Sequence, residues 1–213
     1  MKLEGIYSLY DKGILKDINF EFALGKFYYV VVKNIEIVDA MVDILGLMAP
    51  IMEGLYYING EELSGASYAK KTNIRKNNMG FIFRYLLFDN DLTVYENLLL
   101  PLVNKKNMNS AAKKRLVDDI LIKYNLQSLA LKYPKYLSRY DAQMVALVRA
   151  VINKPKFIVA SDPTDLMNEK EEEAYYKELA NLTKKGIGVI IISTRVKMKN
   201  LADKIYWYEN KLM

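Results

Sequence analysis

The stretch LSRYDAQMVALVRAVINKPKFIVASDPTDLMN, residues 137–168, decides the fold of this chain. Ser138 opens it with a pattern that resembles a capping box, which predicts that a helix starts there. Apolar residues then recur at helical spacing, and the helix is expected to end before Pro155, because proline cannot continue a helix. Phe157–Ala160 is a short apolar run, typical of a strand that is buried on both faces. The stretch therefore predicts a helix, a short loop, a buried strand and a sharp turn at residues 161–164.

Composition places the chain among globular proteins. It has 213 residues, of which 52% are hydrophobic, enough for a sizeable core in one domain or in one domain with a small subdomain. The net charge of +6 comes from scattered lysines and indicates a solvated basic surface, with an anionic membrane face or nucleic acid as minor alternatives. The sequence has no cysteine and no histidine, which excludes disulfides, thiolate metal sites and the commonest general base. No apolar run reaches the ~18 residues of a membrane span and no secretory segment is seen, so we expect a cytoplasmic protein.

Other segments predict further elements of secondary structure. Residues 2–22 are expected to form two strands around a turn at residues 11–13. Residues 64–78 are polar and rich in lysine, and are expected to form a loop. Runs of β-branched and aromatic residues have the length of buried strands at 27–32, 80–83 and 189–193. Helices are expected at 39–47, 107–126 and 169–185.

The stretch at 137–168 resembles the ATP-binding cassette (ABC) nucleotide-binding domains. Their signature, LSGGQ-x-Q-R-V-A-x-A-R-A, precedes a strand that ends in D-E-P-T, and the present sequence aligns with both motifs without a gap. The similarity covers nearly the whole chain and is greatest to the short cassettes of lipoprotein-release, macrolide-export and cell-division type permeases. Segments that fit the family spacing also lie at residues 25–27, 57–60, 92–102 and 202–212.

This resemblance implies an α/β, ABC-type ATPase fold. We expect a P-loop NTPase-like core sheet, with Val30, Ile158 and Ile191 on parallel strands, and an N-terminal antiparallel β region. The chain would form a single domain, 1–213, with its core at 1–85 and 151–213 and a helical subdomain at 86–150.

The family's phosphate-binding loop, G-x-x-x-x-G-K-[ST], aligns with residues 32–39, but its functional residue types are replaced. Val32 and Ile37 stand at the two glycines, Val38 at the lysine and Asp39 at the hydroxyl that holds Mg²⁺. Like charges ~4 Å apart repel by about 4 kcal/mol at an effective dielectric constant near 20. That is comparable to the whole binding free energy of a millimolar ligand, about 4 kcal/mol. Glu36 and Asp39 therefore predict that triphosphate is repelled from this loop.

Five further positions carry roles in the family. Tyr10 stands where relatives stack an aromatic ring on adenine, and an exposed strand tyrosine is the alternative interpretation. Arg84 stands at the glutamine of the family's Q-loop, where we favour a salt bridge or surface role over a phosphate contact. Ser161 and Asp162 replace the Asp-Glu pair that serves Mg²⁺ and acts as general base. Arg195, a permanent cation, replaces a histidine.

The signature itself is altered. Ser138 is kept, but Arg139 and Tyr140 replace the glycines that approach the γ-phosphate, and Asp141 places a carboxylate nearby. In family dimers each nucleotide site combines the phosphate-binding loop of one subunit with the signature of the other. Since this chain has changed both halves, a head-to-tail partner is expected to gain no intact site.

These substitutions predict a pseudo-ATPase, not an enzyme, with no cofactor and no metal. The resemblance suggests an adaptor or scaffold that binds a membrane permease through the region Arg84–Leu102, or another cassette subunit, and lies peripherally on the inner face of the cell membrane. The alternative is a weak or conditional ATPase that uses ATP and Mg²⁺, with Asp162 as base and a partner chain supplying phosphate contacts. A nucleic-acid-binding module is disfavoured, because the sequence lacks arginine clusters interleaved with aromatic residues.

Overall fold

The computed structural model describes residues 1–10 and 13–209. Residues 11 and 12 of the turn expected at 11–13, and the end of the expected terminal segment, 210–212, lie outside the described residues. Within the described chain, no helix is both long and apolar enough to cross a membrane.

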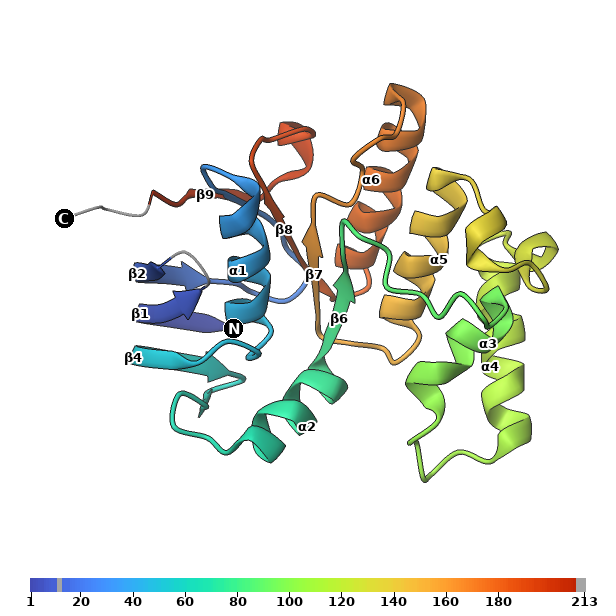
Figure 1. The fold of residues 1–213 in the computed structure, drawn as a ribbon, viewed down its shortest axis with the longest axis horizontal. Helices are drawn as coiled ribbons and strands as arrows, with labels where there is room; N and C mark the ends of the chain where they lie inside the picture. Colours follow the sequence, from blue (N-terminus) through green and yellow to red (C-terminus); the bar gives the residue numbers. More distant parts are fainter. Residues whose placement is uncertain (11–12, 210–213) are drawn as a thin grey trace.

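A five-stranded parallel sheet forms the centre of the molecule (Figure 1). Its strand order is β6-β7-β8-β3-β9 and every neighbouring pair is parallel. Val30 pairs with Ile192, and Ile158 pairs with Val189, so the expected central parallel sheet is confirmed. The strands are β3 (Phe27–Val31), β6 (Met79–Ile82), β7 (Phe157–Ser161), β8 (Gly188–Ser193) and β9 (Lys204–Trp207).

The N-terminal region forms a second, antiparallel sheet. Its order is β2-β1-β4-β5, and its strands are β1 (Lys2–Tyr10), β2 (Gly13–Glu21), β4 (Ile51–Ile58) and β5 (Glu61–Glu62). Gly54 has φ +92°, and a Cβ atom there would lie 2.3 Å from the carbonyl oxygen of Gly5. Glycine is therefore required where β4 passes the backbone of β1 at Gly5.

Alternate residues of the parallel strands pack into two cores. Tyr29, Ile158 and Ile191 belong to the core shared with α5 (Arg139–Val151) and α6 (Glu169–Thr183). Their neighbours Val30 and Ile190 belong to the core shared with α1 (Ile35–Leu45) and the antiparallel sheet. Strands buried on both faces read as continuous apolar runs, and this is why they are visible in the sequence.

The remaining helices are α2 (Tyr68–Asn78), α3 (Val94–Leu99) and α4 (Ser110–Lys123). Helices α3 and α4 lie on the far side of α5 from the sheet (Figure 1). The 3₁₀ turn Leu100–Leu102 and two others, Gln127–Leu129 and Pro134–Tyr136, connect this helical region. Ser138 caps α5 by accepting a hydrogen bond from the Asp141 N–H at 3.1 Å, as the sequence predicts.

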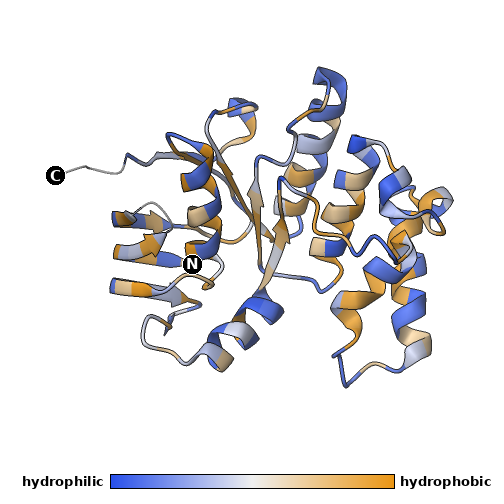
Figure 2. Cartoon of the chain, in the orientation of Figure 1, coloured by the Kyte–Doolittle hydropathy of each residue, from blue (hydrophilic) through white to orange (hydrophobic). Residues whose placement is uncertain are grey.

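The structure corrects several expected boundaries. The segment 64–78, expected to be a loop, contains α2, which has no buried residue and is largely hydrophilic in Figure 2. Without an apolar face the helix has no periodic signal. The helix expected at 39–47 spans 35–45, because Asn34 caps it earlier. Those expected at 107–126 and 169–185 span 110–123 and 169–183.

Candidate functional site

The candidate site lies where the carboxyl ends of β3, β7 and β8 meet the start of α1 (Figure 1). Ligands of open parallel sheets bind at this edge. Three short segments converge there: residues 32–34 after β3, residues 161–165 at the end of β7, and residues 193–195 at the end of β8.

The turn between β3 and α1 is closed by its own hydrogen bonds. The side chain of Asn34 accepts a bond from the Ile37 N–H at 3.1 Å, and its carbonyl accepts one from the Val38 N–H at 3.2 Å. The Val32 N–H donates to the Ser193 carbonyl at 3.0 Å. Val32, Ile37 and Val38 are all buried. These three backbone donors, at positions where relatives have glycine or lysine, are thus engaged within the chain.

Asp39 follows this turn on α1. Desolvation raises the pKa of its carboxyl above 3.8, Asp162 and Glu36 add to that rise, and Arg84 opposes it. The carboxyl of Asp39 therefore interacts electrostatically with Arg84, Asp162 and Glu36. No group of three or more acidic side chains able to hold a metal ion occurs in the described part of the chain.

The end of β7 holds the next two expected site residues. Ser161 is buried, and its hydroxyl accepts a bond from the Arg84 N–H at 3.0 Å. Asp162 has φ +37°, a strained value for a residue other than glycine. Its N–H donates to the Ile192 carbonyl at 3.1 Å and its carboxylate accepts the Ser193 hydroxyl. Burial raises the pKa of Asp162, whereas Ser193, Lys197 and Arg84 lower it.

Three charged residues form what we call the arginine–aspartate cluster: Arg84, Arg139 and Asp165. Arg84 Nε lies 2.9 Å from Asp165 Oδ2. Arg139 Nη2 donates to the Arg84 carbonyl at 2.8 Å, and Arg139 Nε donates to the Asp165 carbonyl at 3.2 Å. The cluster joins the segment after β6, the first turn of α5 and the turn after β7. Arg84 therefore makes a salt bridge, the role favoured over a phosphate contact from the sequence.

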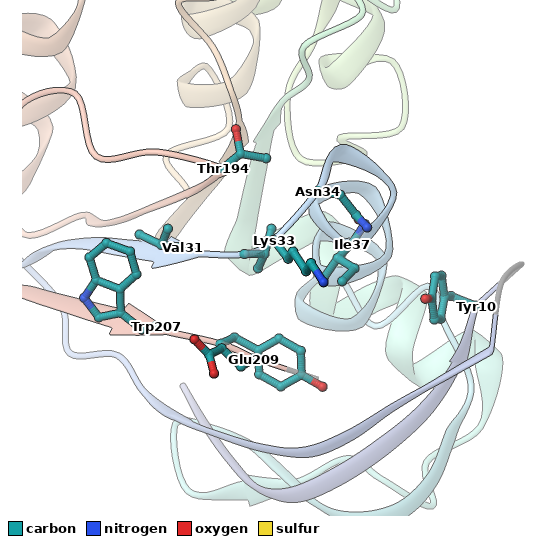
Figure 3. A pocket seen from close by; sticks show the side chains of 10 residues that line it. Tyr10, Val31, Lys33, Asn34, Ile37, Thr194, Trp207 and Glu209 are labelled. Carbon is teal, nitrogen blue, oxygen red and sulfur yellow. The ribbon is translucent and has the colours of Figure 1, made fainter. Parts of the chain in front are cut away.

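A cavity of about 660 Å³ opens beside the β3–α1 turn. Figure 3 shows Tyr10 and Trp207 on opposite sides of it, with Lys33 between them. Trp207 is 71% exposed. Lys33 supplies a cation and Glu209 a carboxylate, so the lining is mixed in charge. Tyr10 thus borders a cavity next to the turn, whereas Arg195 is exposed and does not line it.

Tyr140 and Asp141 lie apart from this cavity, in the first turn of α5. Desolvation raises the pKa of the half-buried Tyr140, and Glu178 adds to that rise.

Sequence reasoning missed four residues of this region. Asn34, Asp165, Ser193 and Trp207 all contact or border it. A cap signal at Asn34, before the apolar positions of α1, could have indicated the early helix start. The partners of Asp165 and Ser193 depend on tertiary contacts.

Comparison with known proteins identifies the class. The family described as "ABC transporter" matches residues 41–165, which is more than half of the chain, and the chain belongs to this family. The matched range begins just after Asp39.

Particular relatives agree with this assignment. The chain is 27% identical over 197 residues to the lipoprotein-releasing system ATP-binding protein LolD of Francisella tularensis subsp. holarctica (strain OSU18), covering 92% of this chain and 85% of LolD. It is 29% identical over 210 residues to the ABC transporter ATP-binding protein MJ1508 of Methanocaldococcus jannaschii, covering 96% and 93% of the two chains. The solved dimeric structure of MJ0796, a bacterial ABC transporter cassette, superposes with a TM-score of 0.86 at 25% identity, covering 98% of this chain and 94% of that one. The expected ABC-type fold is confirmed.

Proposed function

We propose that this chain is a cassette subunit that does not hydrolyse ATP and acts as an adaptor or scaffold for a membrane permease or a cassette partner. The observation that supports this most directly is the closed β3–α1 turn. Phosphate binding at such a turn requires free backbone N–H groups and a cation. Here the N–H groups of Val32, Ile37 and Val38 already have acceptors within the chain.

The side chains around the turn do not fit a magnesium–triphosphate group either. Mg²⁺ is held by oxygen ligands together with the phosphates of its nucleotide. Asp39 and Asp162 offer carboxylates, but Asp162 already accepts a hydrogen bond from Ser193. The Arg84 guanidinium is already paired with Asp165.

The permease is proposed to dock at the segment Arg84–Leu102. Tyr85 and Leu87 are 66% and 60% exposed, and apolar side chains that are exposed together mark interaction surfaces. A groove of about 380 Å³ lies between β6 and the 3₁₀ turn at residues 100–102, lined by Phe81, Leu100 and Arg149 among others. The relatives LolD and MacB are named as an ATP-binding protein of a releasing system and as an ATP-binding/permease protein, which supports a permease as the partner.

Calorimetric titration with MgATP tests the central claim. We expect no measurable binding up to millimolar ATP, because the N–H groups of Val32, Ile37 and Val38 are engaged within the chain and Val38 stands where relatives have a lysine. The ATP-binding cassette MJ0796, which has a solved structure bound to ADP and Pi, serves as the positive control when purified in the same way. A Kd below about 100 µM, which corresponds to more than ~5 kcal/mol of binding free energy, would contradict the proposal.

One observation favours the alternative, a weak or conditional ATPase. A carboxyl whose pKa is raised by burial is a better general base near neutral pH, and the pKa of Asp162 is raised. If this alternative holds, ATP hydrolysis appears only in the presence of the partner chains and is lost on Asp162→Asn. If neither the native chain nor Asp162→Asn hydrolyses ATP in the presence of the partner chains, the result supports the adaptor.

A further inference from the structure

Another cavity, of about 420 Å³, lies at the carboxyl end of α5, and none of its lining residues borders the cavity beside the β3–α1 turn. It is bordered by the C-terminal half of α4 and by the connections that follow α5 and α6. Its volume falls in the range of small-molecule pockets, ~300–1,000 Å³.

The floor of this cavity is apolar. Ile120, Val151, Ile152 and Leu182 line it and are all buried. They belong to the core that α5 and α6 share with the sheet, so the floor is held by packed elements of the fold.

The rim is cationic. Lys123, Lys154, Lys156 and Lys185 border the cavity, and among the described residues none of the four forms an ion pair. Asp119 is the one acid in the lining. The rim therefore carries an excess of positive charge around an apolar floor.

These lysines are close enough to disturb one another. Burial lowers the pKa of Lys123, Lys185 and Lys154 lower it further, and Glu178 partly opposes them. The lysines lie near the carboxyl ends of α4, α5 and α6, where cations are favourable. That preference accounts for single lysines, but not for their convergence on one cavity, since like charges that approach one another are destabilising.

We propose that this cavity binds a small amphipathic anion, whose apolar chain lies on the Ile120–Leu182 floor and whose carboxylate or phosphate is held by Lys123 and Lys185. An apolar body needs the floor, and an anionic head relieves the repulsion between the lysines. A neutral apolar ligand would leave that repulsion in place, and an inorganic anion would leave the floor exposed to water. The site is independent of the proposed adaptor function.

Octanoate is the probe, compared by calorimetry with octanol and acetate, which carry only its chain or only its head. We expect octanoate to bind at least tenfold more tightly than either. Octanoate should also shift the methyl NMR signals of Ile120 and Leu182. Octyl phosphate tests the other head group and is expected to bind in the same way.

Two variants with equal loss of charge locate the site. Lys123→Gln with Lys185→Gln should weaken octanoate binding at least tenfold, while Lys132→Gln with Lys184→Gln, exposed lysines outside the cavity, should change it less than twofold. Equal affinities for octanoate and octanol, equal affinities for octanoate and acetate, or equal effects of the two double variants would each overturn the proposal. Binding to vesicles that contain phosphatidylserine, without binding of octanoate or octyl phosphate, would overturn it in favour of a lipid surface.

Discussion

At the scale of single residues, the arginine–aspartate cluster connects three segments of the candidate site through contacts within the chain. Arg84 and Asp165 are each 29% exposed at their side chains, so water screens their attraction only in part. Partly buried pairs with good geometry stabilise more than surface pairs, whose median contribution is about 0–1 kcal/mol. Arg139 adds two bonds to backbone carbonyls, so the cluster orders three segments at once.

The first prediction concerns Asp165. Asp165→Asn should lower the free energy of unfolding by about 1 kcal/mol, because it removes the charge that orders Arg84, and the loss should shrink in 1 M salt. Urea denaturation measures it. Glu173→Gln, which breaks the exposed helical pair with Lys177, is the matched control and should leave the midpoint unchanged. Equal effects of the two variants would show that the cluster is an ordinary surface contact.

The second prediction concerns the pH dependence of stability at Asp162. Its folded pKa is raised above 3.8, so the folded state holds the proton more tightly, and stability falls as pH rises from 3.8 through the folded pKa. Asp162→Asn, which keeps an acceptor for Ser193, should therefore be more stable than the native chain above this window, and the difference should vanish below it.

Asp203 provides the opposite case for the same measurement. Its pKa is lowered by hydrogen bonds from Lys26 and from the Phe27 N–H, so its stabilisation is present above pH 3.8 and is lost as pH falls through the folded pKa. Asp203→Asn should be less stable than the native chain at neutral pH. Thermal unfolding from pH 3 to 8 compares both variants, and a shift of the same sign for both would contradict the assignment.

At the scale of elements, the β3–α1 turn decides what the site can do. Three residues, 32–34, separate β3 from α1. Asn34 caps the N-terminus of α1, because its side chain accepts a hydrogen bond from the Ile37 N–H. β-branched residues at 32, 37 and 38 favour strand and helix over the positive φ angles that glycine allows. The short turn follows from the same residue types on which the predicted loss of the phosphate-binding motif rests.

The third prediction tests this cap. Asn34→Ala should lower the free energy of unfolding by about 1 kcal/mol, because an alanine leaves the N–H of Ile37 without its side-chain acceptor. Asn34→Asp keeps the acceptor and should remain within about 0.5 kcal/mol of the native chain. Chemical denaturation compares the two variants. If Asn34→Asp lowers the free energy of unfolding as much as Asn34→Ala does, the Asn34 side chain does not act as a helix cap.

The elements that were predictable from the sequence are those whose burial repeats at a regular period. β3, β7 and β8 are buried along their whole length, and α5 has both a capping serine and an apolar face. Helix α2 exposes every side chain to a greater or lesser degree, so its pattern was indistinguishable from that of a polar loop. The site differs again, because the pairing of Asp165 with Arg84, 81 positions apart, is set by the packing of three elements and leaves no local trace.

At the scale of the whole molecule, the positions predicted to be altered lie in two separate places, which the family resemblance predicts to meet across a dimer. The β3–α1 turn lies at the end of the parallel sheet, and Arg139 and Tyr140 lie in the first turn of α5. The relative MJ0796 is described as a dimer, and in a further structure as a dimer bound to ADP and Pi. A partner that supplied its own intact signature to this chain would face the closed turn, and its own phosphate-binding loop would face two large side chains.

The last prediction follows from that double change. Mixed with an intact cassette and the cognate permease, this chain should not form a nucleotide-dependent heterodimer, because neither composite site has both a phosphate-binding loop and an approachable signature. Light scattering with and without MgATP measures the assembly, and steady-state ATPase assays measure the activity of the mixture. An intact cassette that carries a hydrolysis-blocking substitution is the control and should dimerise with ATP under the same conditions.

Because an adaptor acts through its docking surface, Leu87→Glu in the region Arg84–Leu102 should abolish copurification with the permease, whereas Ile122→Glu, equally exposed on α4, should not. The adaptor role would be contradicted if this subunit dimerised with the intact cassette in an ATP-dependent way, or if the ATPase activity of the mixture depended on Asp162. Either result would show that the subunit takes part in ATP binding or hydrolysis.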